Sequence, residues 1–200
     1  MKSKIIIDND CLVNLTGLER FNVFSLLRNV FSQILIPVEV KNEYEKYLEK
    51  EPKRIFILDR LRPNEGFWSL CSISDSYSTD LLLKHNGIDK GEAEVISQSE
   101  KTGVNVIISD DTKFKTAYNK LNKNARIYSS LFLLALLDIH NYLNSPVDIF
   151  KELYKIRPFK HSDLKEAYNQ ASAELQISFE PVKISRKTYK NITEPRFRKI

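Results

Sequence analysis

The chain has 200 residues, 42% of them hydrophobic, and a formal net charge of +5, which suffices for one compact domain with a core. No segment approaches the roughly 20 consecutive apolar residues of a membrane-spanning helix, and two distant cysteines exclude a disulfide framework. The three histidines lack zinc-ligand spacing. We therefore expect a cytoplasmic protein without a membrane partner.

The first half of the chain begins as a strand that ends in acids. Ile5-Ile6-Ile7 predicts a buried parallel strand, and Asp8-Asn9-Asp10 leads from it into a helix. Apolar spacing predicts a helix over 21–32, and 34–36 form a second strand. Pro37 favours the first turn of a helix that reaches Leu48. Further on, the sequence predicts a helix over 53–61, a strand over 67–73 and a helix over 77–85.

The second half continues the alternation of strand and helix. Asp89 begins a helix that Gly103 ends, and 104–108 form the clearest buried strand, followed at once by Asp110 and Asp111. A helix, a strand over 126–128 and an apolar helix over 131–138 follow. This order predicts an α/β fold with a central parallel sheet covered by helices. We expect that domain over 1–144, and two appended helices with a basic tail over 145–200.

The basic tail is a candidate RNA-binding segment. Residues 183–200 carry seven basic residues and one acid, so the remaining chain has a net charge close to zero. Basic side chains bind phosphates by releasing counterions, although a terminal charge run is often only a solvated segment. Both interpretations stay open for four residues that we assign tentatively to RNA binding: Lys183, Arg186, Lys187 and Lys190.

Acids that follow two apolar strands are the first candidates for a site. Ligands of open α/β sheets bind beyond the carboxyl ends of the strands, so Asp8 should share one crevice with Asp110 and Asp111. An aspartate after a strand also commonly caps the next helix. Each of these residues could be a cap and nothing more.

Helical spacing selects two glutamates as further candidates. Glu43 lies on the same stripe as Val40, Tyr44 and Tyr47, and a carboxylate on a buried stripe needs a cation or a metal. The same test selects Glu92, although Asp89 with Glu92 also has the spacing of a capping box. A glutamate paired with a basic residue at the edge of the core remains the alternative for Glu43.

Four or five carboxylates in one crevice would repel one another unless divalent cations neutralised them. Oxygen ligands alone favour Mg²⁺ or Mn²⁺. Such ions activate water and stabilise the leaving oxygen of a phosphodiester. The pattern therefore predicts a metal-dependent nuclease without a covalent intermediate.

Four segments in this order resemble the PIN-domain family, which includes the toxin nucleases of VapC type. They are IIIDNDCLVNL at 5–15, PVEVKNE at 37–43, GIDKGEAEVI at 87–96 and VIISDDTKF at 106–114. The third is similar to a subset with a Gly-Glu-x-Glu-Ala form. The resemblance implies an α/β/α sandwich, Mg²⁺- or Mn²⁺-dependent cleavage of RNA, and often a homodimer; an antitoxin partner stays open.

The resemblance also implies roles by position. Asp8 matches the family's first acid, Glu43 its helical glutamate and Glu92 an acid that is more often aspartate; Asp110 or Asp111 matches the last acid, with a slight preference for Asp111. These five residues are our predicted catalytic and metal-binding set. Asp10 departs from the family, which usually has serine, threonine or asparagine there. The C-terminal extension has no counterpart, and an antitoxin contact, a dimer contact and RNA binding remain open for it.

Two other functions compete. IIIDNDCLV with a later SDD resembles a phosphatase of the haloacid-dehalogenase type, but this interpretation leaves Glu43 and Glu92 without a role. A non-catalytic PIN-like module that binds RNA or a protein is the second alternative, and retention of every acid argues against it.

Overall fold

The computed structural model describes residues 3–50, 62–63, 66–72, 76–121, 123–175, 190 and 192–193. Within these residues, six strands form one sheet in the order β3-β4-β2-β1-β5-β6, and every pairing is parallel. The strands are β1 Lys4–Ile7, β2 Gln33–Pro37, β3 Arg62–Pro63, β4 Trp68–Cys71, β5 Val106–Ile108 and β6 Arg126–Tyr128.

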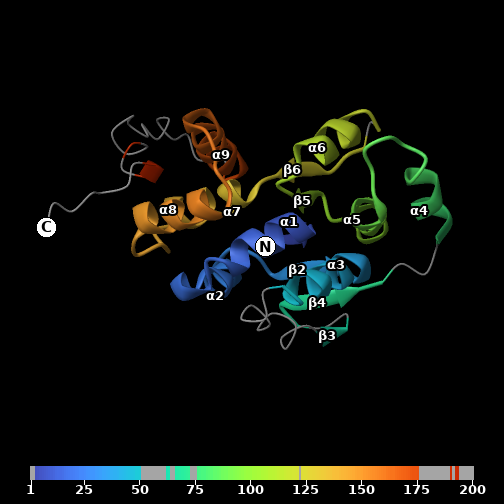
Figure 1. Ribbon diagram of the computed structural model, residues 1–200, viewed down its shortest axis with the longest axis horizontal. Helices are drawn as coiled ribbons and strands as arrows, with labels where there is room; N and C mark the ends of the chain where they lie inside the picture. Colours follow the sequence, from blue (N-terminus) through green and yellow to red (C-terminus); the bar gives the residue numbers. More distant parts are fainter. Residues whose placement is uncertain are drawn as a thin grey trace, which may run out of the picture.

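Helices flank the sheet, with α3, α4 and α5 gathered on one side and α7, α8 and α9 on the other (Figure 1). The predicted α/β/α sandwich with a central parallel sheet is therefore confirmed. The α-helices are α1 Asn9–Thr16, α2 Val23–Leu26, α3 Val38–Leu48, α4 Ser76–Leu82, α5 Lys90–Thr102, α6 Thr112–Asn119, α7 Ser130–Ile139, α8 Pro146–Ile156 and α9 His161–Glu174, and two 3-10 turns lie at Glu19–Phe21 and Leu27–Asn29.

Strand β1 is the middle of the core and sets the level of the site. Ile5, Ile6 and Ile7 have no exposed surface, as expected of β-branched residues in a parallel strand covered on both faces. Ile7 pairs with Ile108 of β5, and the N–H of Asp8 donates to the carbonyl of Ile108 at 2.9 Å. The carboxyl ends of β1 and β5 therefore end side by side.

Most predicted elements of the described chain are present, but the helix expected over 21–32 was wrong. The segment is broken into a 3-10 turn, the short α2 and a second 3-10 turn. Asn22 has a left-handed backbone (φ 57°), a conformation that an α-helix cannot contain. The helix expected over 53–61 lies outside the described residues.

The C-terminal helices pack on the domain. Helix α9 lies along α7, and α8 contacts both α1 and α7. Their buried faces include Ile149, Leu153 and Ala171. The division at residue 144 stays a prediction. Among the described helices, none is long and apolar enough to cross a bilayer.

Candidate active site

Asp8 lies at the carboxyl end of β1 and is the N-cap of α1. One carboxylate oxygen accepts the N–H of Asn9 at 2.7 Å, and the other accepts the hydroxyl of Ser109 at 2.7 Å. Only 5% of Asp8 is exposed. Burial raises the pKa of its carboxyl to about 6, although both hydrogen bonds act to lower it. Asp8 is thus a helix cap that is also costly to ionise without a cation.

Glu43 projects from α3 toward the start of α5. Burial, followed by the charges of Asp89 and Asp8, raises the pKa of its carboxyl to about 7. Its carboxylate lies against the backbone of α5 at Gly91, where a Cβ would be 2.6 Å from Glu43 Oε1. The missing side chain at position 91 therefore makes room for the Glu43 carboxylate.

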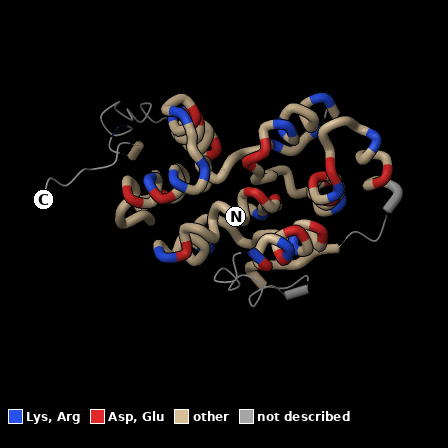
Figure 2. Tube along the Cα trace, in the orientation of Figure 1, with Lys and Arg blue, Asp and Glu red and all other residues tan. Residues whose placement is uncertain are grey.

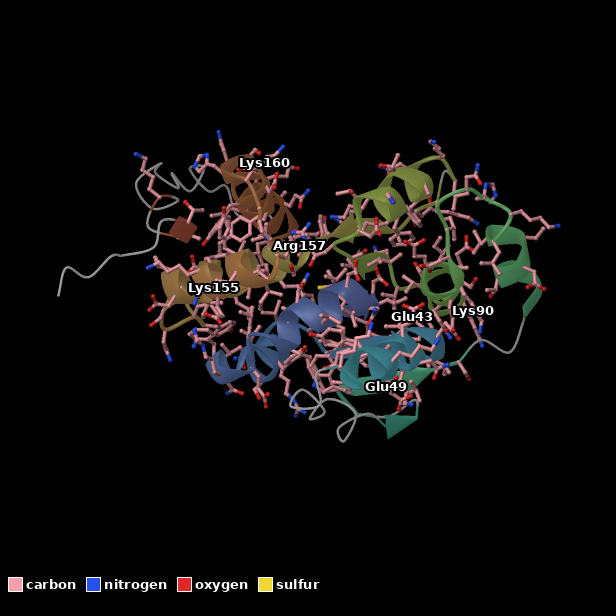
Figure 3. The ribbon with its side chains drawn as sticks, in the orientation of Figure 1. Glu43, Glu49, Lys90, Lys155, Arg157 and Lys160 are labelled. Carbon is pink, nitrogen blue, oxygen red and sulfur yellow. The ribbon has the colours of Figure 1, made fainter. Side chains whose placement is uncertain are left out.

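The other glutamates of α3 have different surroundings. Glu45 pairs with Lys41 at 2.5 Å, and Glu39 pairs with Lys90 at 2.7 Å. Glu49 is exposed, and Figure 3 shows it on the opposite side of α3 from Glu43. Glu43 is thus distinguished from its neighbours on the helix by its place beside Asp8 and α5.

Glu92 and Asp89 form the capping box that their spacing predicted. The N–H of Asp89 donates to Glu92 Oε2 at 2.9 Å, and the N–H of Glu92 donates to Asp89 Oδ1 at 2.9 Å. Glu92 is 7% exposed. Burial, with smaller contributions from the charges of Asp89, Asp8 and Asp111, raises the pKa of its carboxyl to about 8, although the hydrogen bond from the Asp89 backbone acts to lower it. Glu92 therefore both caps α5 and interacts electrostatically with the other acids of the set.

Asp110 is turned into the protein. Its Oδ2 accepts from the Asn14 side chain at 2.8 Å, and its Oδ1 accepts from the backbone N–H of Ser130 at 3.0 Å. Arg157 Nη1 lies 3.5 Å from the same Oδ1. Asp110 therefore ties α1, α7 and the end of α8 together.

Asp111 caps α6 and keeps one oxygen for other contacts. Its Oδ1 accepts the N–H groups of Lys113 at 2.5 Å and Phe114 at 3.0 Å, and its own N–H donates to the Ser109 hydroxyl at 3.1 Å. Within the described chain no hydrogen bond to its Oδ2 occurs. Asp111 is more exposed than Asp110.

These carboxylates form one electrostatic set. Figure 2 shows acidic segments at the start of α1, in α3, at the start of α5 and before α6, around the same region. Burial is the largest cause of the raised pKa values of Glu43, Glu92 and Asp10. The charge of Asp8 adds to the shift of the two glutamates, and the charges of Asp111 and Asp110 add to that of Asp10. The structure thus brings together Asp8, Glu43, Glu92 and Asp111, with Asp110 at the inner edge.

Sequence reasoning missed part of this set. Asp89 acts on four carboxyls, but its sequence signal indicated only a helix cap. Asp10 was noted only as a departure from the family. Arg157 has no local signal, because its contact with Asp110 crosses 47 positions. Of the candidate RNA-binding residues, Lys190 is exposed, and Lys183, Arg186 and Lys187 lie outside the described residues.

An acidic set at the ends of β1 and β5 is compatible with several chemistries, and the family decides among them. A family model described as a PIN domain matches residues 4–174. The chain belongs to the PIN-domain family. PIN domains are generally metal-dependent nucleases that act on RNA. Membership of this family argues against the alternative that the chain is a phosphatase of the haloacid-dehalogenase type. The motif subset stays a prediction. No curated protein and no solved structure matches the chain.

The side chains of this PIN domain fit a divalent cation by their chemistry. All the donors are carboxylate oxygens, and three of the carboxyls have raised pKa values, so a bound cation would relieve their repulsion. In the described residues no three acidic, histidine or cysteine side chains are already close enough to hold one ion. Binding would therefore require the carboxylates to rotate inward.

Proposed function

We propose that the chain is a Mg²⁺- or Mn²⁺-dependent endoribonuclease that hydrolyses RNA phosphodiesters. One observation carries the proposal: Asp8, Glu43 and Glu92 come from three separate elements to the carboxyl edge of the sheet, and burial raises the pKa of each carboxyl. Burying three neighbouring carboxylates is unfavourable for folding, and a bound cation would neutralise their charges. PIN-domain membership supports the same activity.

We assign Asp8, Glu43, Glu92 and Asp111 as metal ligands and Asp110 as a positioning residue. Asp111 Oδ1 caps α6, which leaves its second oxygen for a cation. Asp110 instead faces the interior, where it accepts from Asn14 and Ser130 and lies beside the guanidinium of Arg157. When bound, Mg²⁺ or Mn²⁺ would polarise the phosphodiester and activate the attacking water. The caps at Asp8, Asp89 and Asp111 fix the starts of α1, α5 and α6, the backbone from which the side chains of Asp8, Glu92 and Asp111 extend.

The deciding experiment is cleavage of a mixed set of labelled RNAs by the purified chain with Mn²⁺, beside Asp8→Asn. We expect cleavage that EDTA abolishes and that Asp8→Asn lacks. Asp80→Asn is the matched control, because Asp80 is an exposed aspartate of α4 outside the acidic set. It should cleave like the unmodified chain.

Metal binding gives a second readout. A ligand that binds only the folded chain stabilises it by about 2.7 kcal/mol at 100 times its dissociation constant, so Mn²⁺ should raise the melting temperature of the unmodified chain but not of Asp8→Asn. If no RNA is cut and Mn²⁺ leaves the melting temperature unchanged, the chain is a non-catalytic PIN-like module.

The basic tail is proposed as an auxiliary RNA-binding segment. Its support is the charge of 183–200 and the exposure of Lys190. Replacing the four candidate residues with glutamine should weaken binding of long RNAs and reduce its salt dependence. Unchanged binding would show that the tail does not contribute to RNA binding.

A toxin role in a toxin–antitoxin pair is a finer proposal. It predicts growth arrest on induction in a bacterial host, lost in Asp8→Asn and relieved by a small protein encoded beside the gene. Leu81 and Leu83 are both 42% exposed and supply an apolar surface for such an antitoxin or for a second copy of the chain. Growth unaffected by the active nuclease would contradict the toxin role.

A further inference from the structure

Arg157 connects the C-terminal extension with the acidic set. It follows α8 with an extended backbone (φ −138°, ψ 100°). Its Nη2 donates to the carbonyl of Asp110 at 3.2 Å, and its Nη1 lies 3.5 Å from Asp110 Oδ1. In Figure 3 Arg157 lies toward the centre of the molecule, whereas Lys155 and Lys160 lie farther out on the extension. The extension therefore delivers one guanidinium to the site.

The contacts with Asp110 do not use the whole guanidinium. The group has five N–H donors in a planar fork, and this geometry suits phosphate as well as carboxylate. Both contacts with Asp110 are long, and the oxygens of that carboxylate already accept from Asn14 and Ser130. The Arg157 side chain is 27% exposed. Donors therefore remain that a ligand can reach from solvent.

Lys115 provides a second cation on the same side of the site. It lies on α6, is half-buried, and interacts electrostatically with Asp110, Asp111 and Arg157. Its ammonium has no hydrogen bond or ion pair with any described residue. A half-buried ammonium beside a second cation is costly unless an anion offsets the charge. Asp110, the carboxylate whose charge acts most strongly on Lys115, already accepts hydrogen bonds from Asn14 and Ser130.

Arg157 contacts Asp110, and the charge of Asp110 acts on Lys115, whereas Figure 3 shows Glu43 on α3, away from Arg157. An RNA strand that places one phosphate at the acids must bring its neighbouring phosphate past the edge of the set. That phosphate repels the carboxylates unless positive side chains meet it. We propose that Arg157, assisted by Lys115, binds the RNA phosphate adjacent to the one that is cleaved, an inference that rests on the proposed nuclease function.

The test measures RNA binding without cleavage. A labelled oligouridylate is titrated with the full chain in EDTA over a range of salt concentrations. Each phosphate contact on single-stranded RNA contributes about 0.7 to the slope of log K against log salt, so Arg157→Gln should lower the slope by that amount and weaken low-salt binding about ten-fold. Lys115→Gln should lower the slope similarly, and Arg157→Lys should retain most of it.

Lys155→Gln is the matched control. It removes the same charge two residues earlier, in α8, at a position that is 69% exposed and paired with Glu152, so slope and affinity should not change. In Mn²⁺-dependent cleavage, Arg157→Gln should raise KM more than it lowers kcat. A structural role through Asp110 would instead lower kcat and the melting temperature and leave the salt slope unchanged.

Unchanged slopes in both Arg157→Gln and Lys115→Gln overturn the inference, as does failure of the unmodified chain to bind the oligouridylate. If Arg157→Gln does not fold, the slopes of Lys115→Gln and Arg157→Lys decide. A chain that cleaves RNA with unchanged slopes keeps the proposed function and loses this inference. A chain that binds as expected but never cleaves loses the proposed function and keeps the phosphate contact.

Discussion

At the scale of single residues, Glu43 combines a cost to folding with the metal-ligand role that we propose for it. Its pKa of about 7 means that the ionised form, which a cation needs, is disfavoured in the metal-free fold. Glu43→Gln keeps the size of the side chain and removes the charge. The substitution should therefore affect activity and stability in opposite directions.

We expect Glu43→Gln to reduce RNA cleavage on the order of 100-fold or more, in the range for loss of a transition-state contact. At pH 8 and without metal, it should stabilise the fold by about 1 kcal/mol. This is well below the roughly 3 kcal/mol that a shift from 4.5 to about 7 gives at 1.36 kcal/mol per pKa unit, because the group is only half-buried. Thermal unfolding and cleavage assays measure the two effects. Glu49→Gln, an exposed change at the end of α3, should alter neither.

The raised pKa values also predict how metal-free stability depends on pH. Asp8, Glu43 and Glu92 have folded-state pKa values of about 6, 7 and 8, above the unfolded values near 4. Between these limits the folded chain binds more protons than the unfolded chain, so stability falls as pH rises from about 4.5 to 8. Melting temperatures in EDTA should show this fall, and Mn²⁺ should reduce it. A metal-free melting temperature that rises across the window would contradict the assignment.

At the scale of helices and strands, α3 and α5 approach at Gly91. A Cβ there would lie 2.6 Å from Glu43 Oε1, so Gly91→Ala must displace the flexible carboxylate. A displacement of about 1 Å can reduce catalysis about 100-fold, while alanine in a helix changes stability by less than about 1 kcal/mol. Cleavage assays should show the loss without unfolding. If Gly91→Ala acts by displacing Glu43, adding it to Glu43→Gln should cause no further loss of cleavage activity.

The turn between β5 and α6 carries two aspartates, Asp110, which makes structural hydrogen bonds, and Asp111, which we propose as a metal ligand. Asp110→Ala leaves Asn14 and the Ser130 N–H without their acceptor and should destabilise the fold by about 3 kcal/mol. Asp111→Asn keeps an N-cap of equal quality, so stability should change by less than about 0.5 kcal/mol, while cleavage is lost. Denaturant unfolding and cleavage assays together test both assignments. Full activity in Asp111→Asn would transfer the ligand role to Asp110.

Local sequence signals predicted those elements whose ends are marked by side chains. Helix α5 begins after the Asp89 cap and ends at Gly103 with φ 68°, as the sequence indicated. The segment 21–32 shows the limit of such signals. Its regularly spaced apolar residues are buried, but they lie in a series of short helical turns and not in one helix. The left-handed Asn22 gives no signal strong enough to outweigh that spacing.

The candidate site was predictable to the same extent. Strand topology alone places Asp8 and the 110–111 pair at one edge, and helical spacing points Glu43 and Glu92 toward it. The choice between Asp110 and Asp111 depends on Asn14 and Ser130, which are distant in sequence. Tertiary packing, and not local pattern, makes that choice, as it does for Arg157.

At the scale of the whole molecule, the C-terminal helices cover α7. Residues 130–137 are all buried, and α8 and α9 form much of that cover. Removing residues 145–200 would expose this apolar helix to water at about 25 cal/mol per Å². We expect a 1–144 fragment to aggregate or to unfold without cooperativity, measured by calorimetry beside the full chain. A fragment that melts cooperatively would show that the domain folds without the extension.

The hydrogen bond from Ser109 to Asp8 joins residues 101 positions apart, and Arg157 reaches the same site from another 47 positions beyond Asp110. The N-terminus of a chain leaves the ribosome first, and β1 cannot pair with β5 before β5 has also emerged. More than half of the chain must therefore be synthesised before Asp8 can form its contact with Ser109. A nascent chain that ends before Asp111 therefore cannot assemble the proposed site.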